Sequence, residues 1–446
     1  MGKTYREWRI DEAWLLPPSV RELVPANEAA HFIRDLARDE LDLSAILNTY
    51  DEERGFPPYH PVMMTALLLY AYTQGIRSSR KIARACATRV DFMAVTAMQR
   101  PDFRTVSDFR LRHLEALAEL FGQVLQLCEK AGLVKLGHVA LDGTKIQANA
   151  SKRKAMSYER MKKTEQQLKA EIAEWFKKAA EEDEEEDRRY GKDSSGDELP
   201  EWVANKQKRL EKIREAKAAL EAEAKAQLAA GVKPEPPDKP GGGGAKRSRK
   251  KPKANGEPND QAQLNFTDVD SKILKTSDGF LQGYNGQAAV DSHAQIIVGH
   301  ALTNEQNDSQ QLVPMTRQIR ERLGRNPDEI SADFNYLSED NLQALERRRI
   351  EAYIATGRLK HHATDEPRKR REPQGPRSQR MRTKLKRGGF QSRYRLRKQV
   401  VEPVFGQMKE QLGMRRMMLR GLQKVKAEWA FNCTIHNLKK LTRYTA

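Results

Sequence analysis

The stretch Glu329–Asp333, with the sequence Glu-Ile-Ser-Ala-Asp, has the length and apolar centre of a buried β-strand, and it ends on a carboxylate. A helix is predicted directly after it, over Ser338–Arg349, with Ser338 near its start. The segment Ile350–Thr356 predicts the next strand. A strand, a helix and a strand in this order favour a sheet that is covered by helices.

Two more strands and a helix are expected before this unit. Tyr284–Asp291 and Gln295–Thr303 have strand composition, and the three residues between them are enough for a hairpin turn. Asp308–Leu323 is predicted to be a helix, with Asp308 as its cap. The element order therefore predicts an α/β fold with a mixed sheet flanked by helices.

A short apolar strand is also predicted at Val139–Leu141, and Asp142, Gly143 and Thr144 follow it. An Asp-Gly pair in this place has two interpretations. It is a common hairpin turn, or Asp142 is a strand-end carboxylate like Asp333. The choice depends on whether partner carboxylates exist elsewhere in the chain.

Composition narrows the class of partner. The chain has 446 residues and a formal net charge of +18, which suits a polyanion such as nucleic acid. It has no apolar run of membrane-spanning length and no signal peptide at its start. Cys86, Cys128 and Cys433 fit neither a zinc motif nor a disulfide framework. We expect buried free thiols in a cytoplasmic, nucleoid-associated bacterial protein.

Residues 1–135 predict a helical domain. Its helices are expected at about 27–37, 40–49, 61–74, 78–87, 89–98 and 106–131. Within it, a turn at Gly75 leads into a helix that Ser78 opens, which is the outline of a helix-turn-helix. Arg77, Arg80 and Lys81 are the candidate DNA contacts there.

A second basic run in this domain offers an alternative reading helix. Arg104–Arg112 lies at the start of the helix expected at 106–131, with Ser107 or Thr105 as its cap. Either helix would present cations to phosphate, so the sequence leaves both open.

Residues 151–257 interrupt the strand pattern. Apolar residues at helical spacing in two stretches predict a helical hairpin of coiled-coil type, with the acidic run Glu181–Asp187 between them. A Pro- and Gly-rich linker with the basic tract Lys246–Lys253 follows. The tract is either solvated or in contact with nucleic acid. The predicted domains are therefore 1–135, the pair 136–150 and 258–446, and the insertion 151–257.

The excess positive charge is concentrated in residues 358–398, which hold 16 cations against three acids. A segment of this sign is expected to meet phosphates. His361 and His362 lie within it, where a metal site is not favoured.

The segment Tyr394–Lys409 follows directly and has helical composition, with Glu402 as its one acid. On a helix, Lys398, Glu402 and Lys409 fall within about 40° of one another. Pro403 predicts a kink or a helix start.

Glu402 has two interpretations in this setting. It forms a surface ion pair with Lys398, or it is a carboxylate aimed at the sheet. Val400, Val404 and Met408 lie to one side of the edge that holds Glu402, and they suit a buried face.

Asp142, Asp333 and Glu402 together would make a hard-oxygen site of the kind that prefers Mg²⁺ or Mn²⁺. Two such ions can activate a water or a 3′-hydroxyl and stabilise the leaving oxygen in an in-line phosphoryl displacement. Cations beside the site would hold the substrate phosphates.

Four motifs resemble the DDE insertion-sequence transposases, and more narrowly the group with a helical N-terminal domain and a Tyr-Arg-Glu-Lys signature. They are Leu141–Lys145, Gly283–Ala288, Ala332–Tyr336 and Tyr394–Lys409. The resemblance implies a ribonuclease H-like catalytic fold, two divalent metal ions and cut-and-paste DNA chemistry.

The resemblance also assigns residues. Asp142, Asp333 and Glu402 match the metal-binding catalytic triad. Tyr394, Arg397 and Lys409 match the signature and are expected to hold DNA near Glu402. Lys398 is an alternative to Arg397, because the signature has three residues between its Arg and its Glu, which is the spacing of Lys398 from Glu402.

One departure concerns the motif at Asp333. Asn335 stands where the family has Gly, and Asn is expected to preserve a left-handed turn there.

The sequence thus predicts a DNA transposase. It would bind the terminal inverted repeats of its element, cleave the strand and join the 3′-hydroxyl to target DNA, as a homodimer or larger assembly. Three alternatives are a catalytically inactive DNA-binding protein of the same descent, a metal-dependent nuclease of the same fold, and a coiled-coil scaffold centred on residues 158–230.

Overall fold

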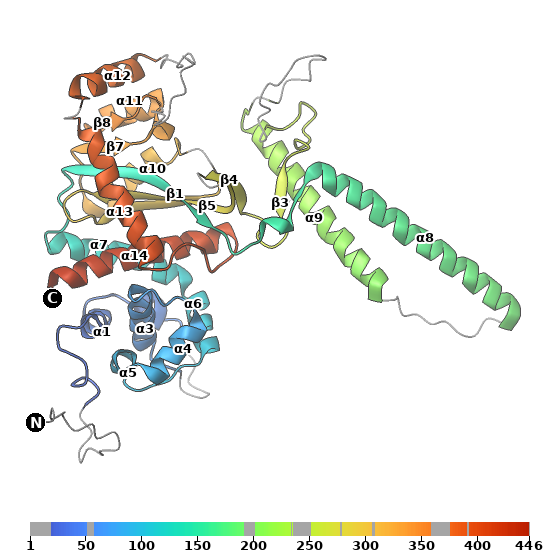
Figure 1. Cartoon of the computed structure of the whole chain (residues 1–446), viewed down its shortest axis with the longest axis horizontal. Helices are drawn as coiled ribbons and strands as arrows, with labels where there is room; N and C mark the ends of the chain where they lie inside the picture. The colour runs from blue at the N-terminus through green and yellow to red at the C-terminus, as the bar shows by residue number, and fades with distance from the viewer. Residues whose placement is uncertain are drawn as a thin grey trace, which may run out of the picture.

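The structure is a computed structural model (Figure 1). It describes residues 19–50, 58–190, 201–232, 234, 251–276, 279–305, 308–357, 375–389 and 392–445. The expected linker around Gly241–Gly244, the first part of the basic tract, and His361 and His362 lie outside the described residues. A body of helices and a sheet carries a long arm of two helices, which projects from one side.

The N-terminal part is helical, as expected. Its helices are α1 (Ala29–Asp39), α2 (Ser44–Leu47), α3 (Pro61–Thr73), α4 (Ser79–Thr88), α5 (Val90–Thr96), α6 (Phe103–Arg112) and α7 (Leu114–Lys130). The nearly apolar helix α3 is buried along most of its length, because almost every one of its side chains meets another helix.

The prediction of one helix over 106–131 was wrong. The chain leaves helical geometry at His113, which has φ −106° and ψ 22°, and this residue separates α6 from α7. The predicted caps Thr105 and Ser107 were also wrong. Asp102 is the cap, because its side chain accepts hydrogen bonds from the backbone N–H groups of Arg104 and Thr105.

The sheet is mixed, which confirms the expected fold class. Its strands are β1 (His138–Gln147), β4 (Lys272–Thr276), β5 (Gly279–Asp291), β6 (Ile297–Thr303), β7 (Glu329–Ala332) and β8 (Glu351–Ile354). They run in the order β4-β5-β1-β7-β8, and β6 pairs with the other half of β5. Strand β1 is antiparallel to β5 and parallel to β7, and β7 is parallel to β8.

Strand β1 does not end before Asp142. It continues to Gln147 because β5 is long enough to pair with all of it, and Asp142 lies opposite Ala288. The hairpin-turn interpretation of Asp142 and Gly143 is therefore wrong. The predicted strand end at Leu141 is wrong for the same reason.

Helices cover the sheet. They are α10 (Leu312–Leu323), α11 (Glu339–Arg347), α12 (Pro376–Gly388), α13 (Leu396–Glu410) and α14 (Leu422–Thr445). Helix α13 crosses the strands, and α14 lies between the sheet and the N-terminal helices (Figure 1). The ring of Tyr72 in α3 lies 5.0 Å from that of Phe431 in α14. The N-terminal helices and the sheet therefore share one hydrophobic core.

The arm confirms the expected helical hairpin. It consists of α8 (Tyr158–Tyr190) and α9 (Glu201–Ala229), with the two-stranded sheet of β2 (Ala155–Ser157) and β3 (Gln263–Asn265) at its base. It has a hydrophobic cluster of its own, which includes Met161, Leu168, Ile213 and Leu220. The acidic run 181–187 belongs to α8. The predicted boundaries at 135, 150 and 257 stay a prediction.

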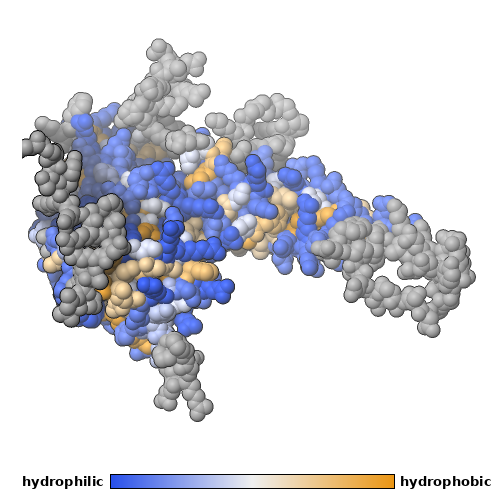
Figure 2. Space-filling model, turned by 60° about the horizontal axis from the view of Figure 1, so that its bottom comes forward, coloured by the Kyte–Doolittle hydropathy of each residue, from blue (hydrophilic) through white to orange (hydrophobic). Residues whose placement is uncertain are grey.

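Most of the described surface is hydrophilic on the face that Figure 2 shows, with smaller apolar patches on the body and along the arm. None of the described helices is long and apolar enough to cross a membrane. Cys86, Cys128 and Cys433 are buried free thiols, as expected.

Candidate active site

Strand register brings Asp142 and Asp333 to the same place. Strands β1 and β7 are parallel, and Leu141 is the partner of Ala332. Asp142 follows Leu141 and Asp333 follows Ala332, so both aspartates lie level with the carboxyl end of β7. Two neighbouring parallel strands therefore present one carboxylate each at the same level of the sheet.

The Asp142 carboxylate is largely buried, with 18% of its side chain exposed. It forms an ion pair with the guanidinium of Arg397 and accepts a hydrogen bond of 2.9 Å from the N–H of Gly143. Burial raises the pKa of Asp142 to about 6; the charge of Arg397 lowers it, and the charges of Asp333 and Asp308 raise it. Asp142 thus lies within electrostatic range of two other carboxylates.

Asp333 opens a short 3₁₀ turn, Phe334–Tyr336, and is fixed by the residue two positions on. Its Oδ1 accepts from the backbone N–H of Asn335 at 2.8 Å, and its Oδ2 accepts from the Asn335 side-chain amide at 3.2 Å. The expectation of a left-handed Asn335 was wrong, since this residue is not among those with positive φ. A 3₁₀ turn needs negative φ, and the amide is used as a donor instead.

Asp308 is a third carboxylate in this cluster, and sequence reasoning missed it. The predicted cap role was wrong, because α10 begins later and its cap position is Gln311. The Asp308 side chain accepts from the side-chain amides of Asn285 and Gln287 on β5, the latter at 2.6 Å. The available signal was the amide pair Asn285 and Gln287, two positions apart and therefore on one face of a predicted strand.

Arg397 is the cation at the centre of the site. Its side chain is 11% exposed, its Cζ lies 5.8 Å from the centre of the Tyr394 ring, and its Nε has no partner among the described residues. Lys398 is exposed on another face of α13. The structure therefore places Arg397, and not Lys398, at Asp142.

Glu402 is not assembled with the two aspartates. It is exposed. Glu402 comes five residues after Arg397 on α13, so the two side chains point about 140° apart around the helix axis. Within the described part of the chain, no three His, Cys, Asp or Glu side chains lie close enough together to hold a metal ion. The structure thus brings together two members of the expected triad and leaves the third apart.

The remaining expectations for α13 hold in part. Val400, Val404 and Met408 are buried, as predicted. Lys409 is half-buried, and this burial lowers its pKa. Helix α13 begins at Leu396 and runs through Pro403, so the predicted start there was wrong.

Pro403 has no N–H to donate to the carbonyl of Gln399. The side-chain amide of Gln295 donates to that oxygen instead, at 3.3 Å. A residue of the turn between β5 and β6 thus replaces the missing helical hydrogen bond.

The N-terminal candidates separate into two kinds. Arg77 is buried, and its guanidinium donates to Glu428 at 2.5 Å and to the carbonyls of Gly413 and Arg416. It therefore ties the turn between α3 and α4 to the C-terminal part and is not available to phosphate. Arg80 and Lys81 are exposed, with the Arg80 guanidinium 5.0 Å from the Phe103 ring.

Helix α12 adds a basic surface beside the sheet. Its Lys384 donates to the carbonyl of Ala352 in β8 at 2.7 Å, which holds the helix against the strand next to β7. Arg380, Lys386 and Arg387 are exposed, and Arg380 and Arg387 line an open groove on this helix.

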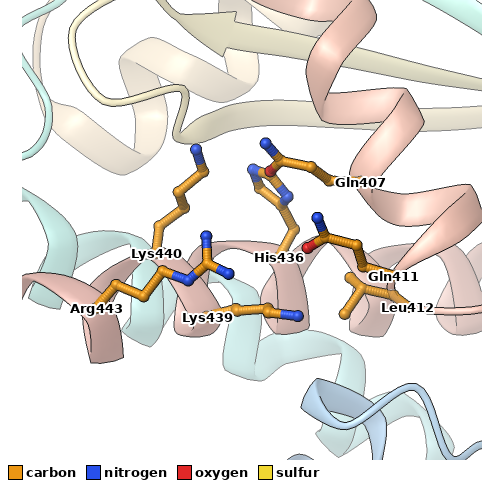
Figure 3. Close-up of a pocket in the computed structure, with 7 residues that line it drawn as sticks. All are labelled: Gln407, Gln411, Leu412, His436, Lys439, Lys440 and Arg443. Atoms are coloured by element: carbon orange, nitrogen blue, oxygen red, sulfur yellow. The ribbon is translucent and has the colours of Figure 1, made fainter.

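A second, much smaller hollow lies between α13 and α14 (Figure 3). It is lined by Gln407, Gln411, Leu412, His436, Lys439, Lys440 and Arg443. Burial lowers the pKa of His436 to about 4, and its ring nitrogen lies 2.9 Å from the carbonyl of Gln295. This lining has no carboxylate, so the hollow is not part of the acidic cluster.

The fold and the site define an α/β protein with a mixed sheet, in which one carboxylate within β1 lies beside another that directly follows the parallel strand β7. A family model described as a transposase DDE domain matches residues 261–438, and a second, described as a transposase domain (DUF772), matches residues 18–112. Both describe transposases, and together they cover more than half of the chain. The chain belongs to the DDE transposases, and its sheet is the ribonuclease H-like core that a DDE domain implies. No curated protein and no solved structure matched.

Proposed function

We propose that this transposase binds the ends of its element, cleaves the DNA strand there and joins the freed 3′-hydroxyl to target DNA, using divalent metal ions. The observation that carries the proposal is the parallel register of β1 and β7, which sets Asp142 beside Asp333. A register of backbone hydrogen bonds fixes both carboxylates before any ligand arrives.

The residues present fit a divalent cation. Asp142 and Asp333 offer carboxylate oxygens, the donors that Mg²⁺ and Mn²⁺ prefer. The charges of Asp333 and Asp308 raise the pKa of Asp142, so the three carboxylates act on one another electrostatically. A metal ion held by Asp142 and Asp333 would relieve this repulsion.

Asp142 and Asp333 would hold the metal, with Glu402 as the third ligand. A metal ion at such a site activates the attacking oxygen and stabilises the leaving one. For Glu402 to join, α13 must turn or shift, and Arg397 must release Asp142. The released guanidinium could then pair with a DNA phosphate, with Tyr394 beside it.

The surfaces around the site suit a polyanion. The exposed cations of α12 lie beside β8, next to the strand that precedes Asp333. Lys398 and Lys409 lie on the Glu402 edge of α13, and Arg80 and Lys81 are exposed on α4. We infer that α12 and α13 hold DNA across the carboxyl end of the sheet and that α4 contacts the element end.

A strand-nicking assay tests this function. DNA that carries the element ends should be nicked with Mg²⁺ or Mn²⁺ and left intact with EDTA, and a labelled 3′ end should be joined to target DNA. A non-enzymatic DNA-binding protein would bind without cutting, and a nuclease of this fold would cut without joining.

A salt titration tests the α12 surface. Replacing Arg380 and Arg387 by Gln should reduce the slope of log affinity against log salt by about 0.9 per lost phosphate contact. Lys163 on the arm, which pairs with Glu159, is the matched control, and Lys163→Gln should leave the slope unchanged. An unchanged slope in the α12 variant would place the DNA elsewhere.

A further inference from the structure

Asp308 is a buried anion with neutral partners. Its side chain is almost fully buried, and its carboxylate accepts from the amides of Asn285, Gln287 and Asn335. Within the described residues, no Lys or Arg forms an ion pair with it. A buried carboxylate without a counter-cation is costly for folding. Stability alone therefore does not account for Asp308.

The Asn335 amide joins Asp308 to Asp333. An amide nitrogen has two N–H groups, and the nitrogen of Asn335 lies 3.3 Å from Asp308 Oδ2 and 3.2 Å from Asp333 Oδ2. The backbone N–H of Asn335 holds the other oxygen of Asp333 at 2.8 Å. Both oxygens of Asp333 are thereby oriented by one residue, which is itself held by Asp308.

The bridge is anchored on β5. Gln287 donates to Asp308 and accepts from the hydroxyl of Tyr336, the last residue of the turn that Asp333 opens. Strand β5 also pairs with β1 at Asp142, which lies opposite Ala288. One strand thus fixes the level of Asp142 and, through Asp308, the direction of Asp333.

Asp308 acts indirectly in this arrangement. Since no three acidic side chains of the described chain are close enough to hold an ion, Asp308 is not itself a third ligand. It supplies negative charge and an anchor for Asn335. Groups that orient metal ligands in this way typically change metal affinity by about 10–100-fold when they are removed.

We propose that Asp308 and Asn335 form a positioning pair that orients the Asp333 carboxylate for metal binding. The inference rests on the proposed function, because it takes Asp333 as a metal ligand. It uses Asn335, which stands where the family motif has Gly.

Metal binding by the full chain without DNA tests the pair. Free and bound Mn²⁺ would be measured by electron paramagnetic resonance at pH 8, where Asp142 is ionised. Asp308→Asn and Asn335→Gly should each raise the Mn²⁺ concentration for half-saturation about tenfold. The double variant should bind Mn²⁺ no more weakly than Asp308→Asn alone, because the two residues act through the same series of contacts.

A matched control separates positioning from folding. Asp268 is another buried carboxylate, which accepts from the hydroxyl of Tyr284 at 2.8 Å. Asp268→Asn should leave Mn²⁺ half-saturation unchanged. Thermal unfolding identifies any variant that does not fold. If Asp308→Asn is unstable, the Mn²⁺ affinity of Asn335→Gly tests the proposal instead, because Asn335 lies in a partly exposed turn. Saturating Mn²⁺ should restore nicking in both variants.

Two failures can be told apart. Folded Asp308→Asn and Asn335→Gly proteins that bind Mn²⁺ like the wild type would overturn the positioning pair alone. A wild-type protein that binds no Mn²⁺, with no difference from Asp142→Asn, would overturn the proposed function itself.

Discussion

The strand-borne carboxylates and the helix-borne carboxylate of this transposase differ in how firmly they are placed. Asp142 and Asp333 follow partner residues of two hydrogen-bonded parallel strands. Glu402 lies on α13, which packs on the sheet through apolar side chains and is exposed at Glu402. Backbone pairing permits one register, whereas an apolar helix face tolerates rotation and sliding. The sheet therefore places the two aspartates, the strand half of the proposed site, without any ligand, whereas Glu402, the helix half, lies apart from them.

Arg397 marks the same difference. It lies on α13 and forms an ion pair with the carboxylate of Asp142. Under the proposed function, this ion pair would have to open before Asp142 could bind a metal ion.

The largest expected effect belongs to the strand half. Asp142→Asn and Asp333→Asn should each reduce metal-dependent nicking by about a thousandfold, the scale of losing one charge-stabilising group. Rates of nicking on element-end DNA check this. If either variant keeps a tenth of the wild-type rate, the strand pair is not the site.

The helix half should show its importance only in the reaction. Glu402→Gln should reduce nicking by about a hundredfold or more and leave Mn²⁺ binding without DNA unchanged. The control is Glu410→Gln on the same helix, since Glu410 is also exposed and pairs with Arg415. Equal nicking by the two variants would remove Glu402 from the site.

The ion pair between the halves predicts a pH dependence. The pKa of Asp142 is about 6, so Mn²⁺ binding should be lost as pH falls through that value. Arg397 lowers this pKa, and Arg397→Gln should therefore move the midpoint to higher pH. Binding titrations between pH 5 and pH 8 measure the midpoint. A midpoint that stays in place or moves down would contradict the pairing.

The smallest expected effect concerns the attachment of α13. In Gln295→Asn the side chain is one methylene shorter, so its amide should no longer reach the Gln399 carbonyl. The free energy of unfolding should fall by about 1 kcal/mol. In a Pro403→Ala background the loss should be smaller, because the restored N–H can serve that carbonyl. Urea unfolding of the four proteins gives the coupling, and equal losses in both backgrounds would refute it.

Much of the fold was predictable from local patterns. The strand composition at 284–291 and the apolar centre at 329–333 predicted the strands, and the helical spacing on both sides of residue 190 predicted the arm. The extension of β1 past Asp142 was not predictable, because it depends on the length of β5, which is over a hundred residues away.

The site was predictable in the identity of its acids but not in its assembly. Asp142 and Asp333 each follow a short apolar run, and such runs can be read from the sequence. The burial of Asp308 depends on the amides of a separate strand, and the direction of Glu402 depends on how α13 sits on the sheet. Tertiary packing determines both features.

Anomalous X-ray scattering from crystals soaked in Mn²⁺ without DNA tests the central claim most directly. We predict Mn²⁺ bound by the carboxylates of Asp142 and Asp333, with Arg397 moved from Asp142 and Glu402 still apart. Mn²⁺ absent from Asp142 and Asp333, or already ligated there by Glu402, would contradict the claim that the strands alone form the site.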